Sequence, residues 1–406
     1  MKIIESRYFA IFSILIIIFY LFYSELVYDY FVAQDTSKYI GLFRDWIITL
    51  DDTYCEIQLD NDQCRPYQIG PILLYLPFTN TLENFYYFIL PNIFIVLFVI
   101  SIFIIFGKYY KENKFLIFCL IFSPTSLFAL ERGNLDVLLF LVAILIAYNK
   151  FFFINLFLIS VSVLLKYYPI TFFLNIFTHL KSKSKKILNI SLILTVLFSL
   201  LFIFYHKSVL IDLFSNLGGS KAGFHFIYSI KSIAKIVKYL FSLNYIFLLL
   251  IVYSFFIFLA YKLIKYNYKN KLENKLSLTN IEEKLFLIGT NTSLFTYLLF
   301  SNIFYREIFI ILSIPLLIKL NNELPYLKIL KFMLFLIVIR YLFLHLHNYT
   351  LLTENHYHID GVRVFFNSFL ITLTIKSILD YFLMAFLGSL VFFQNLKIIK
   401  IIFYKI

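Results

Sequence analysis

The chain has 406 residues, of which 61% are hydrophobic and 15% are charged, and its mean hydropathy is +0.86. So many apolar side chains exclude an ordinary soluble protein and predict an all-α, polytopic membrane protein surrounded by membrane lipids. The net charge of +13 lies mostly in short lysine clusters between apolar runs. That pattern is typical of cytoplasmic loops and does not indicate a nucleic-acid partner.

The apolar runs predict about twelve membrane-spanning helices in a single transmembrane domain over residues 1–406. In chain order, they lie near 8–28, 84–106, 115–131, 135–148, 151–166, 169–180, 187–205, 241–261, 285–301, 308–320, 329–346 and 364–385. The first has no small-residue cleavage site, so we expect an uncleaved helix. The lysine clusters place both termini in the cytoplasm of a multi-pass protein of the cell (inner) membrane.

Residues 29–83 form a long first loop on the predicted outer, periplasmic face. The loop is rich in acids and contains the only tryptophan of the chain, Trp46. Its segment 66–80 is too short to span the membrane and is interrupted by Pro71 and Pro77. We therefore expect this segment to lie in the interface or to re-enter the membrane.

Several predicted helices between residues 115 and 180 are unusually short. Their apolar runs have 11 to 16 residues, whereas crossing a bilayer takes about 20. The corners "ERGNLD" (131–136) and "LKYYP" (165–169) should therefore lie below the outer surface. Charged backbone at that depth requires a water-filled cavity or burial in protein, so we predict that both corners line one outward-facing cavity.

Arginine is unevenly distributed in this topology. The chain has seven arginines, and five of them lie on or near the outer face, against the usual preference for positive charge inside. Because guanidinium binds phosphate and carboxylate through two parallel hydrogen bonds, this distribution indicates an anionic ligand. The alternative is that each arginine pairs with a nearby acid such as Glu131, Asp45 or Glu307. The five are Arg44, Arg65, Arg132, Arg306 and Arg363.

The motifs resemble a known family over roughly residues 8 to 320. "ERGNLDVLLF", "LLKYYPITFF" and "SNIFYREIFIILSIPLL" look like the multi-helix GT-C glycosyltransferases. They are closest to glycosyltransferase family 87, the polyprenol-phosphate-mannose-dependent mannosyltransferases. "QDTSKY" and "RPYQIGPILLYLPF" in the first loop are similar to that family's Asp and its Tyr-Pro-rich segment. The sequence has "YQIGP" where the family more often has a Tyr-Pro-Pro type, which leaves the substrate subgroup open.

This resemblance implies a GT-C-like bundle that moves a mannose-like hexose from a polyprenyl-phosphate donor. The acceptor would be a lipid or glycan hydroxyl of the cell envelope on the outer face. Inversion at the anomeric carbon needs one carboxylate to accept the acceptor proton and cationic donors on the departing phosphate. No cofactor is expected, and the sequence has no glycine-rich nucleotide-binding pattern.

Asp35 is the predicted general base, because it follows the first helix where the family has its catalytic Asp. Tyr39 lies one helical turn further on and is assigned to the substrate site. The alternative is that Asp35 caps a short surface helix. Asp29 and Asp45 are the other candidates for the base.

Lys166 and Arg306 are the predicted phosphate ligands. Lys166 ends a short apolar helix and faces outward, although an interfacial lysine that extends to water would have the same position. Arg306 could instead pair with its neighbour Glu307. Arg363, from the outer set of arginines, is also assigned to substrate binding.

The "ERGN" corner contributes two further candidates to the substrate site. Arg132 could contact substrate, or Glu131 or Asp136 could hold it and so fix the corner. Gly133 and Asn134 fit a tight turn, in which the Asn134 amide could hold a sugar hydroxyl.

Two further groups of residues could bind metal or form a bridge. Cys55 and Cys64 could form a disulfide if their loop faces an oxidising compartment. Four histidines lie within one late outer loop, but their spacing matches no standard zinc pattern, so we expect no metal. These histidines are His345, His347, His356 and His358.

Two other functions remain open from the sequence. A lipid-linked oligosaccharide polymerase or ligase would share the many helices and the outward arginines. A polytopic lipid or solute transporter often shows inverted repeats, and we find no internal repeat here.

Overall fold

The computed structural model describes residues 85–109, 112–179, 227–299, 302–353 and 368–405. It also describes ten single residues, which are 11, 15, 46, 47, 49, 50, 190, 193, 194 and 197. Within these ranges the fold is helical, apart from one antiparallel pair of two-residue strands. The predicted helices 8–28 and 187–205 lie largely outside the described residues, as does most of the loop 29–83, including the segment 66–80.

The described elements follow one another with short connections. In chain order they are η2 (Phe85–Ile89), α5 (Leu90–Phe106), α6 (Lys114–Ile121), α7 (Pro124–Glu131), α8 (Leu135–Tyr148), α9 (Phe152–Leu165), η3 (Tyr168–Phe172), α10 (Phe173–His179), β1 (Ile227–Tyr228), α13 (Lys231–Phe241), α14 (Tyr245–Lys269), α15 (Leu272–Lys275), α16 (Ile281–Leu299), β2 (Asn302–Ile303), η6 (Phe304–Ser313), α17 (Ile314–Glu323), α18 (Lys328–Thr353) and α19 (Ser368–Lys405).

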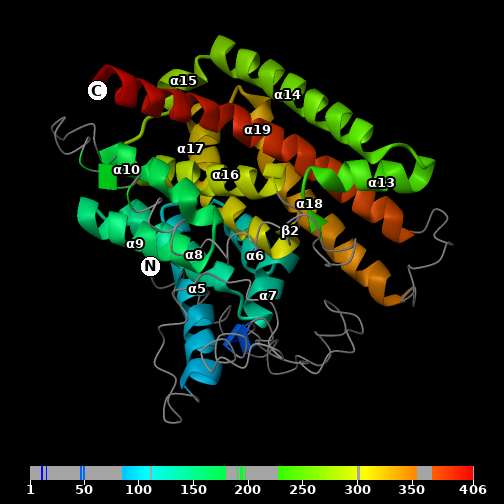
Figure 1. Cartoon of the computed structure of the whole chain (residues 1–406), viewed down its shortest axis with the longest axis horizontal. Coiled ribbons are helices and arrows are strands. Elements are labelled where there is room, and N and C mark those ends of the chain that lie inside the picture. Colours follow the sequence, from blue (N-terminus) through cyan, green and yellow to red (C-terminus); the bar gives the residue numbers. More distant parts are fainter. Residues whose placement is uncertain are drawn as a thin grey trace.

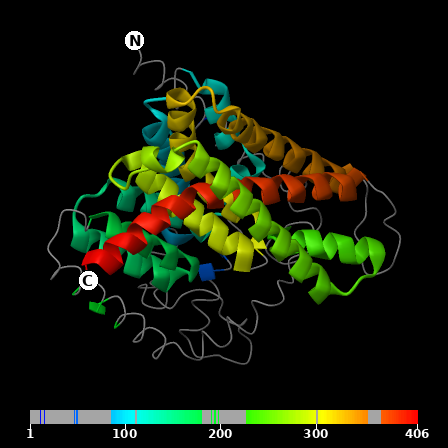
Figure 2. The same ribbon diagram turned by 90° about the horizontal axis from the view of Figure 1, so that it is seen from above.

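Four segments of the described chain are long and apolar enough to cross a membrane. They are Lys114–Glu131, Tyr245–Lys269, Lys328–Leu346 and Ile371–Ile401. This agrees with the all-α membrane-type architecture expected from composition, while the total of twelve spans stays a prediction. In Figure 1, α14 and α19 run side by side along one edge of the bundle, and Figure 2 shows the same pair from above.

The short helices predicted from the apolar runs are present. The helix predicted over 135–148 is α8, and that over 151–166 is α9, each with 14 residues. At 1.5 Å of rise per residue, each is about 21 Å long, which is shorter than the roughly 30 Å hydrocarbon core of a bilayer. The corners at their ends can therefore lie at membrane depth, inside the fold.

Proline and capping side chains divide two segments that the sequence predicts as single helices. The predicted helix 115–131 is two helices, because Pro124 starts α7 and lacks the N–H that a continuous helix needs. Ser123 caps α7 by accepting a hydrogen bond from the Ser126 N–H at 3.1 Å. The predicted helix 241–261 begins later, as α14, because Ser242 is left-handed (φ 53°) and Asn244 caps the new helix.

At the centre of the bundle, α16 crosses η6 at very short range (Figure 1). A Cβ atom built on Gly289 would lie 2.6 Å from both the carbonyl oxygen of Phe309 and the Cβ of Leu312. Only a residue without a side chain fits between these atoms, so Gly289 sets how closely the two elements approach. The paired strands fix the beginning of η6, with Ile227 opposite Ile303 and Tyr228 opposite Asn302.

Candidate functional site

The "ERGN" corner is a compact turn between α7 and α8. Gly133 has a φ of 57°, which favours glycine, and its N–H donates to the carbonyl of Leu130 at 3.0 Å. The N–H of Asn134 donates to the carbonyl of Ala129 at 3.0 Å, so the two bonds form a Schellman motif that ends α7. The Asn134 side chain then caps α8 by accepting from the N–H of Asp136 at 3.0 Å. This is the tight turn expected from Gly133 and Asn134.

The "KYYP" corner brings a lysine and a tyrosine to the first turn of α8. The backbone is extended at Lys166, which ends α9, and its ammonium group contacts Oδ1 of Asp136. The same ammonium group donates to Oδ1 of Asn134 at 3.0 Å. Tyr168 also reaches the carboxylate, and its hydroxyl donates to Oδ1 of Asp136 at 2.6 Å. Two corners that are about thirty residues apart in sequence therefore meet at one acid.

Arg306, from the third motif, reaches the same carboxylate from the beginning of η6. Its Nε lies 3.6 Å from Oδ2 of Asp136, and its Nη1 donates to the hydroxyl of Tyr167 at 2.9 Å. The guanidinium carbon is 5.8 Å from the ring centroid of Tyr167 and 5.5 Å from that of Tyr168, in the range of cation–π contacts. We name the resulting group the corner cluster; its members are Asn134, Asp136, Lys166, Tyr167, Tyr168 and Arg306.

The charges of the corner cluster are arranged asymmetrically. The Asp136 side chain is fully buried, whereas the side chains of Lys166 and Arg306 are 13% and 17% exposed. One buried acid thus holds two cations that retain some access to the surface. The positions of both cations are fixed, because a buried carboxylate is stable only when it is well paired. The partly exposed side of the cluster carries an excess of positive charge.

Glu307 faces away from its neighbour Arg306 and takes part in a second charged group. Its Oε1 lies 2.7 Å from Nζ of Lys376, and its Oε2 lies 3.0 Å from Nη1 of Arg340. Asp380 contacts the same two cations, at 2.8 Å from Lys376 Nζ and 2.9 Å from Arg340 Nη1. We name these four residues the inner quartet.

The inner quartet is buried and has two acids against two bases. None of its side chains is more than 3% exposed. Arg340 belongs to α18, and Lys376 and Asp380 to α19, so the quartet joins these helices to η6 beneath the corner cluster. Because its charges cancel inside the protein, its arrangement is that of a structural support.

The described part of the first loop packs against the corner cluster's turn. The N–H of Trp46 donates to the carbonyl of Arg132 at 3.2 Å, and its Nε1 donates to the carbonyl of Tyr86 at 2.7 Å. The indole is 2% exposed and makes an edge contact with Phe94, with 5.7 Å between ring centroids. Trp46 therefore fixes one point of this loop beside the "ERGN" corner.

The structure brings Asn134, Lys166 and Arg306 together and changes the expected partners of two arginines. Arg306 does not depend on Glu307, because Glu307 is held by Lys376 and Arg340. Arg132 places its guanidinium carbon 4.6 Å from the Phe128 ring centroid, while Asp136, one of its expected partners, contacts Lys166 and Arg306.

Other expectations from the sequence concern residues outside the described ranges. Within those ranges, no group of three His, Cys, Asp or Glu side chains is close enough to hold a metal ion. Of the four clustered histidines, only the His345 side chain is described. The expected outward-facing cavity stays a prediction. The site and cysteine residues that lie outside the described ranges are Asp35, Tyr39, Arg363, Cys55 and Cys64.

Sequence reasoning did not assign Asp136, Tyr168 or the inner quartet to a shared polar centre. A signal was present, because Lys376 and Asp380 are four residues apart in an apolar run and Arg340 interrupts another. Ionisable residues in such runs usually face one another across a bundle. Their spacing does not reveal which acid meets which base, and that information comes from the packing of η6, α18 and α19.

No family model, curated protein or solved structure matches this chain. Its function is therefore inferred from the arrangement of its own residues.

Proposed function

We propose that the protein is a membrane glycosyltransferase that uses a polyprenyl-phosphate sugar. It moves a mannose-like hexose to a hydroxyl of a lipid or glycan acceptor on the outer face of the cell membrane, with inversion. The proposal rests on the convergence of three motifs at Asp136, which places Lys166 and Arg306 together. These motifs are the ones that resemble the GT-C enzymes.

The corner cluster has the chemistry that a phosphate leaving group requires. When the bond between a sugar and a phosphate breaks, negative charge increases on the phosphate oxygen. Lys166 supplies a compact charge and Arg306 a planar fork of donors, and both are fixed in place before substrate arrives. Their partial exposure lets a phosphate approach from the surface while Asp136 stays buried.

The position of the first loop supports Asp35 as the general base. Trp46 is hydrogen-bonded to the "ERGN" corner, and Asp35 precedes it by eleven positions in the same loop. Eleven residues of extended chain can span at most about 36 to 40 Å, so Asp35 is within reach of the corner cluster. Asp29 and Asp45 belong to the same region and remain the reserve candidates.

In the proposed reaction, the acceptor oxygen attacks the anomeric carbon from the side opposite the phosphate. The carboxylate of Asp35 takes the proton of the acceptor hydroxyl as the new carbon–oxygen bond forms. The bond between the anomeric carbon and the phosphate oxygen breaks, and its electron pair stays on the phosphate. Lys166 and Arg306 stabilise the charge that develops there.

The first experiment measures transfer from radiolabelled polyprenyl-phosphate hexoses in membranes that contain the full-length protein. Asp35→Asn keeps the size of the side chain but removes the base, so transfer should be lost. Asp60→Asn makes the same change in the same loop, at a residue assigned to no step, and should retain transfer. Equal transfer by wild type and Asp35→Asn would move the base to Asp29 or Asp45.

A second comparison tests the phosphate ligands. Arg306→Gln should lower kcat by about a hundredfold, the usual effect of removing one donor from a developing oxyanion. Arg306→Lys should recover part of this loss, because it restores the charge without the planar fork. If wild type consumes no polyprenyl-phosphate hexose of any kind, the polymerase, ligase and transporter alternatives replace the proposal.

A further inference from the structure

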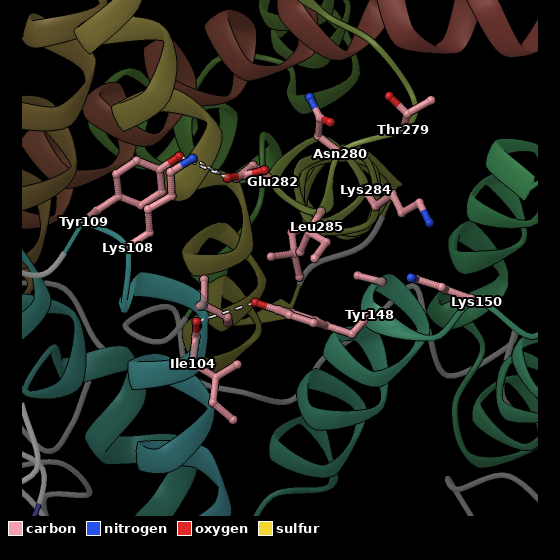
Figure 3. Close-up of a pocket in the computed structure, with 13 residues that line it drawn as sticks. Ile104, Lys108, Tyr109, Tyr148, Lys150, Thr279, Asn280, Glu282, Lys284 and Leu285 are labelled. Atoms are coloured by element: carbon pink, nitrogen blue, oxygen red, sulfur yellow. Dashed lines mark hydrogen bonds and ion pairs between the residues drawn. The ribbon is translucent and has the colours of Figure 1, made fainter. Parts of the chain in front are cut away.

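A second basic pocket lies at the opposite end of α8 and α16 from the corner cluster. The corner cluster contacts the first turn of α8, whereas this pocket is formed where α8 ends and α16 begins. It has a volume of about 500 Å³, within the range of small-molecule sites. Figure 3 shows its lining side chains, which come from the C-terminal ends of α5 and α8 and from the start of α16.

Three lysines line this pocket against a single acid. Lys150 and Lys284 extend toward the same side, while Lys108 lies across the pocket beside Glu282 (Figure 3). Glu282 is already engaged, because it accepts from the Tyr109 hydroxyl at 3.1 Å and lies 3.7 Å from Lys108 Nζ. Among the described residues, neither Lys150 nor Lys284 has a carboxylate within ion-pair distance.

The two lysines on the open side repel each other. Burial lowers the pKa of Lys284, and the charge of Lys150 lowers it further. Lys284 lies in the first turn of α16, just before the apolar stretch that begins at Leu285. A bound anion between the two ammonium groups would remove this repulsion, so the pocket has the electrostatics of an anion site.

Apolar surface continues from the pocket along the outside of the bundle. Ile104 on α5 and Leu145 on α8 are each 55% exposed, and Leu97 and Ile100 continue the exposed side of α5. Tyr148 lies at the edge, where its hydroxyl donates to the carbonyl of Ile104 at 3.5 Å. Lysines beside a tyrosine at the end of an apolar helix are the usual arrangement at a membrane interface. A ligand with a charged head and apolar chains fits both parts.

We infer that this pocket binds the phosphate headgroup of an anionic phospholipid in the leaflet opposite the candidate active site. Lys150 and Lys284 contact the phosphate, and the acyl chains lie against the exposed faces of α5 and α8. Basic pockets between membrane helices on the cytoplasmic side are known to select anionic lipids in this way. The inference is independent of the proposed glycosyltransferase activity.

The test is native mass spectrometry of the purified, delipidated full-length protein, titrated with dioleoyl phosphatidylglycerol or dioleoyl phosphatidylcholine. The wild type should bind a first phosphatidylglycerol more tightly than phosphatidylcholine. Lys150→Gln/Lys284→Gln should weaken this first step about 30-fold, since each lysine near an anionic headgroup contributes roughly a fivefold gain. Lys150→Arg/Lys284→Arg keeps both charges and should retain binding.

The matched control is Lys328→Gln/Lys331→Gln, which removes the same charge from exposed lysines outside the pocket, at the start of α18. It should leave the first step unchanged. Equal losses in the two glutamine variants, or no preference for phosphatidylglycerol in the wild type, would overturn the inference. Radiolabelled glycerol phosphate in equilibrium dialysis distinguishes the source: binding of this soluble phosphate without a lipid preference would also overturn the lipid assignment.

Discussion

Nζ of Lys376 lies 2.7 Å from Oε1 of Glu307, although 69 positions separate the two residues in sequence. The bond connects α19 to the first turn of η6, and Arg306 occupies the preceding position in that turn. Glu307 faces the inner quartet and Arg306 faces the corner cluster. The closed, neutral quartet thus fixes the element that presents a candidate phosphate ligand.

Breaking the inner quartet should be costly. Lys376→Met leaves Glu307 and Asp380 with Arg340 alone, and an uncompensated buried charge typically lowers the free energy of unfolding by about 3 to 5 kcal/mol. Lys376→Met/Asp380→Leu removes one charge of each sign and should lose less than the single variant. Thermal unfolding in detergent measures both; a larger loss in the double variant would contradict this account.

The hydroxyl of Tyr168 should matter more than its ring. Tyr168→Phe keeps the edge contact with Phe309, with 5.6 Å between ring centroids, but removes the donor to the buried Asp136 carboxylate. A hydrogen bond to a charged group contributes about 1.5 to 3 kcal/mol, and unfolding experiments should show a loss of that size. Tyr326→Phe, at a residue 66% exposed, makes the same chemical change and should have no measurable effect.

The crossing of α16 and η6 should not tolerate a methyl group. Gly289→Ala places a Cβ 2.6 Å from the carbonyl oxygen of Phe309, so the two elements must separate. Overpacking of this kind costs about 1 to 3 kcal/mol. Gly388→Ala is the matched control, because its Cβ would meet only Leu294 side-chain atoms at 3.5 Å, an ordinary contact. Equal melting temperatures for the two variants would refute the role of Gly289.

Binding of phosphatidylglycerol to the basic pocket should depend on alkaline pH. Burial and the charge of Lys150 lower the pKa of Lys284, so this lysine loses its proton earlier than an ordinary lysine as pH rises. Affinity should therefore be constant near neutral pH and fall on the alkaline side. Lys284→Arg, which stays protonated, should shift that fall to higher pH. An unchanged profile in this variant would show that Lys284 does not contact the ligand.

Local sequence determined the helices and corners because their causes are local. Apolar runs of 14 residues produced α8 and α9 close to the predicted bounds, and Gly133 with Asn134 specified the turn between α7 and α8. The departures were also local in cause, since Pro124 interrupted one predicted helix and Asn244 started another later than expected. Hydropathy averages over such single residues and does not register them.

The charged partners were decided by tertiary structure alone. The sequence identified Lys166 and Arg306 as candidates from their residue types and positions, but it did not show that both would meet Asp136. Adjacent residues on a tight helical turn point in different directions, so Arg306 and Glu307 entered separate charge groups. Composition, period and capping therefore determined that this chain is a bundle of apolar helices with buried polar corners. Which charges neutralise one another depends on how helices distant in sequence pack, because ion pairing acts through space between the ends of flexible side chains.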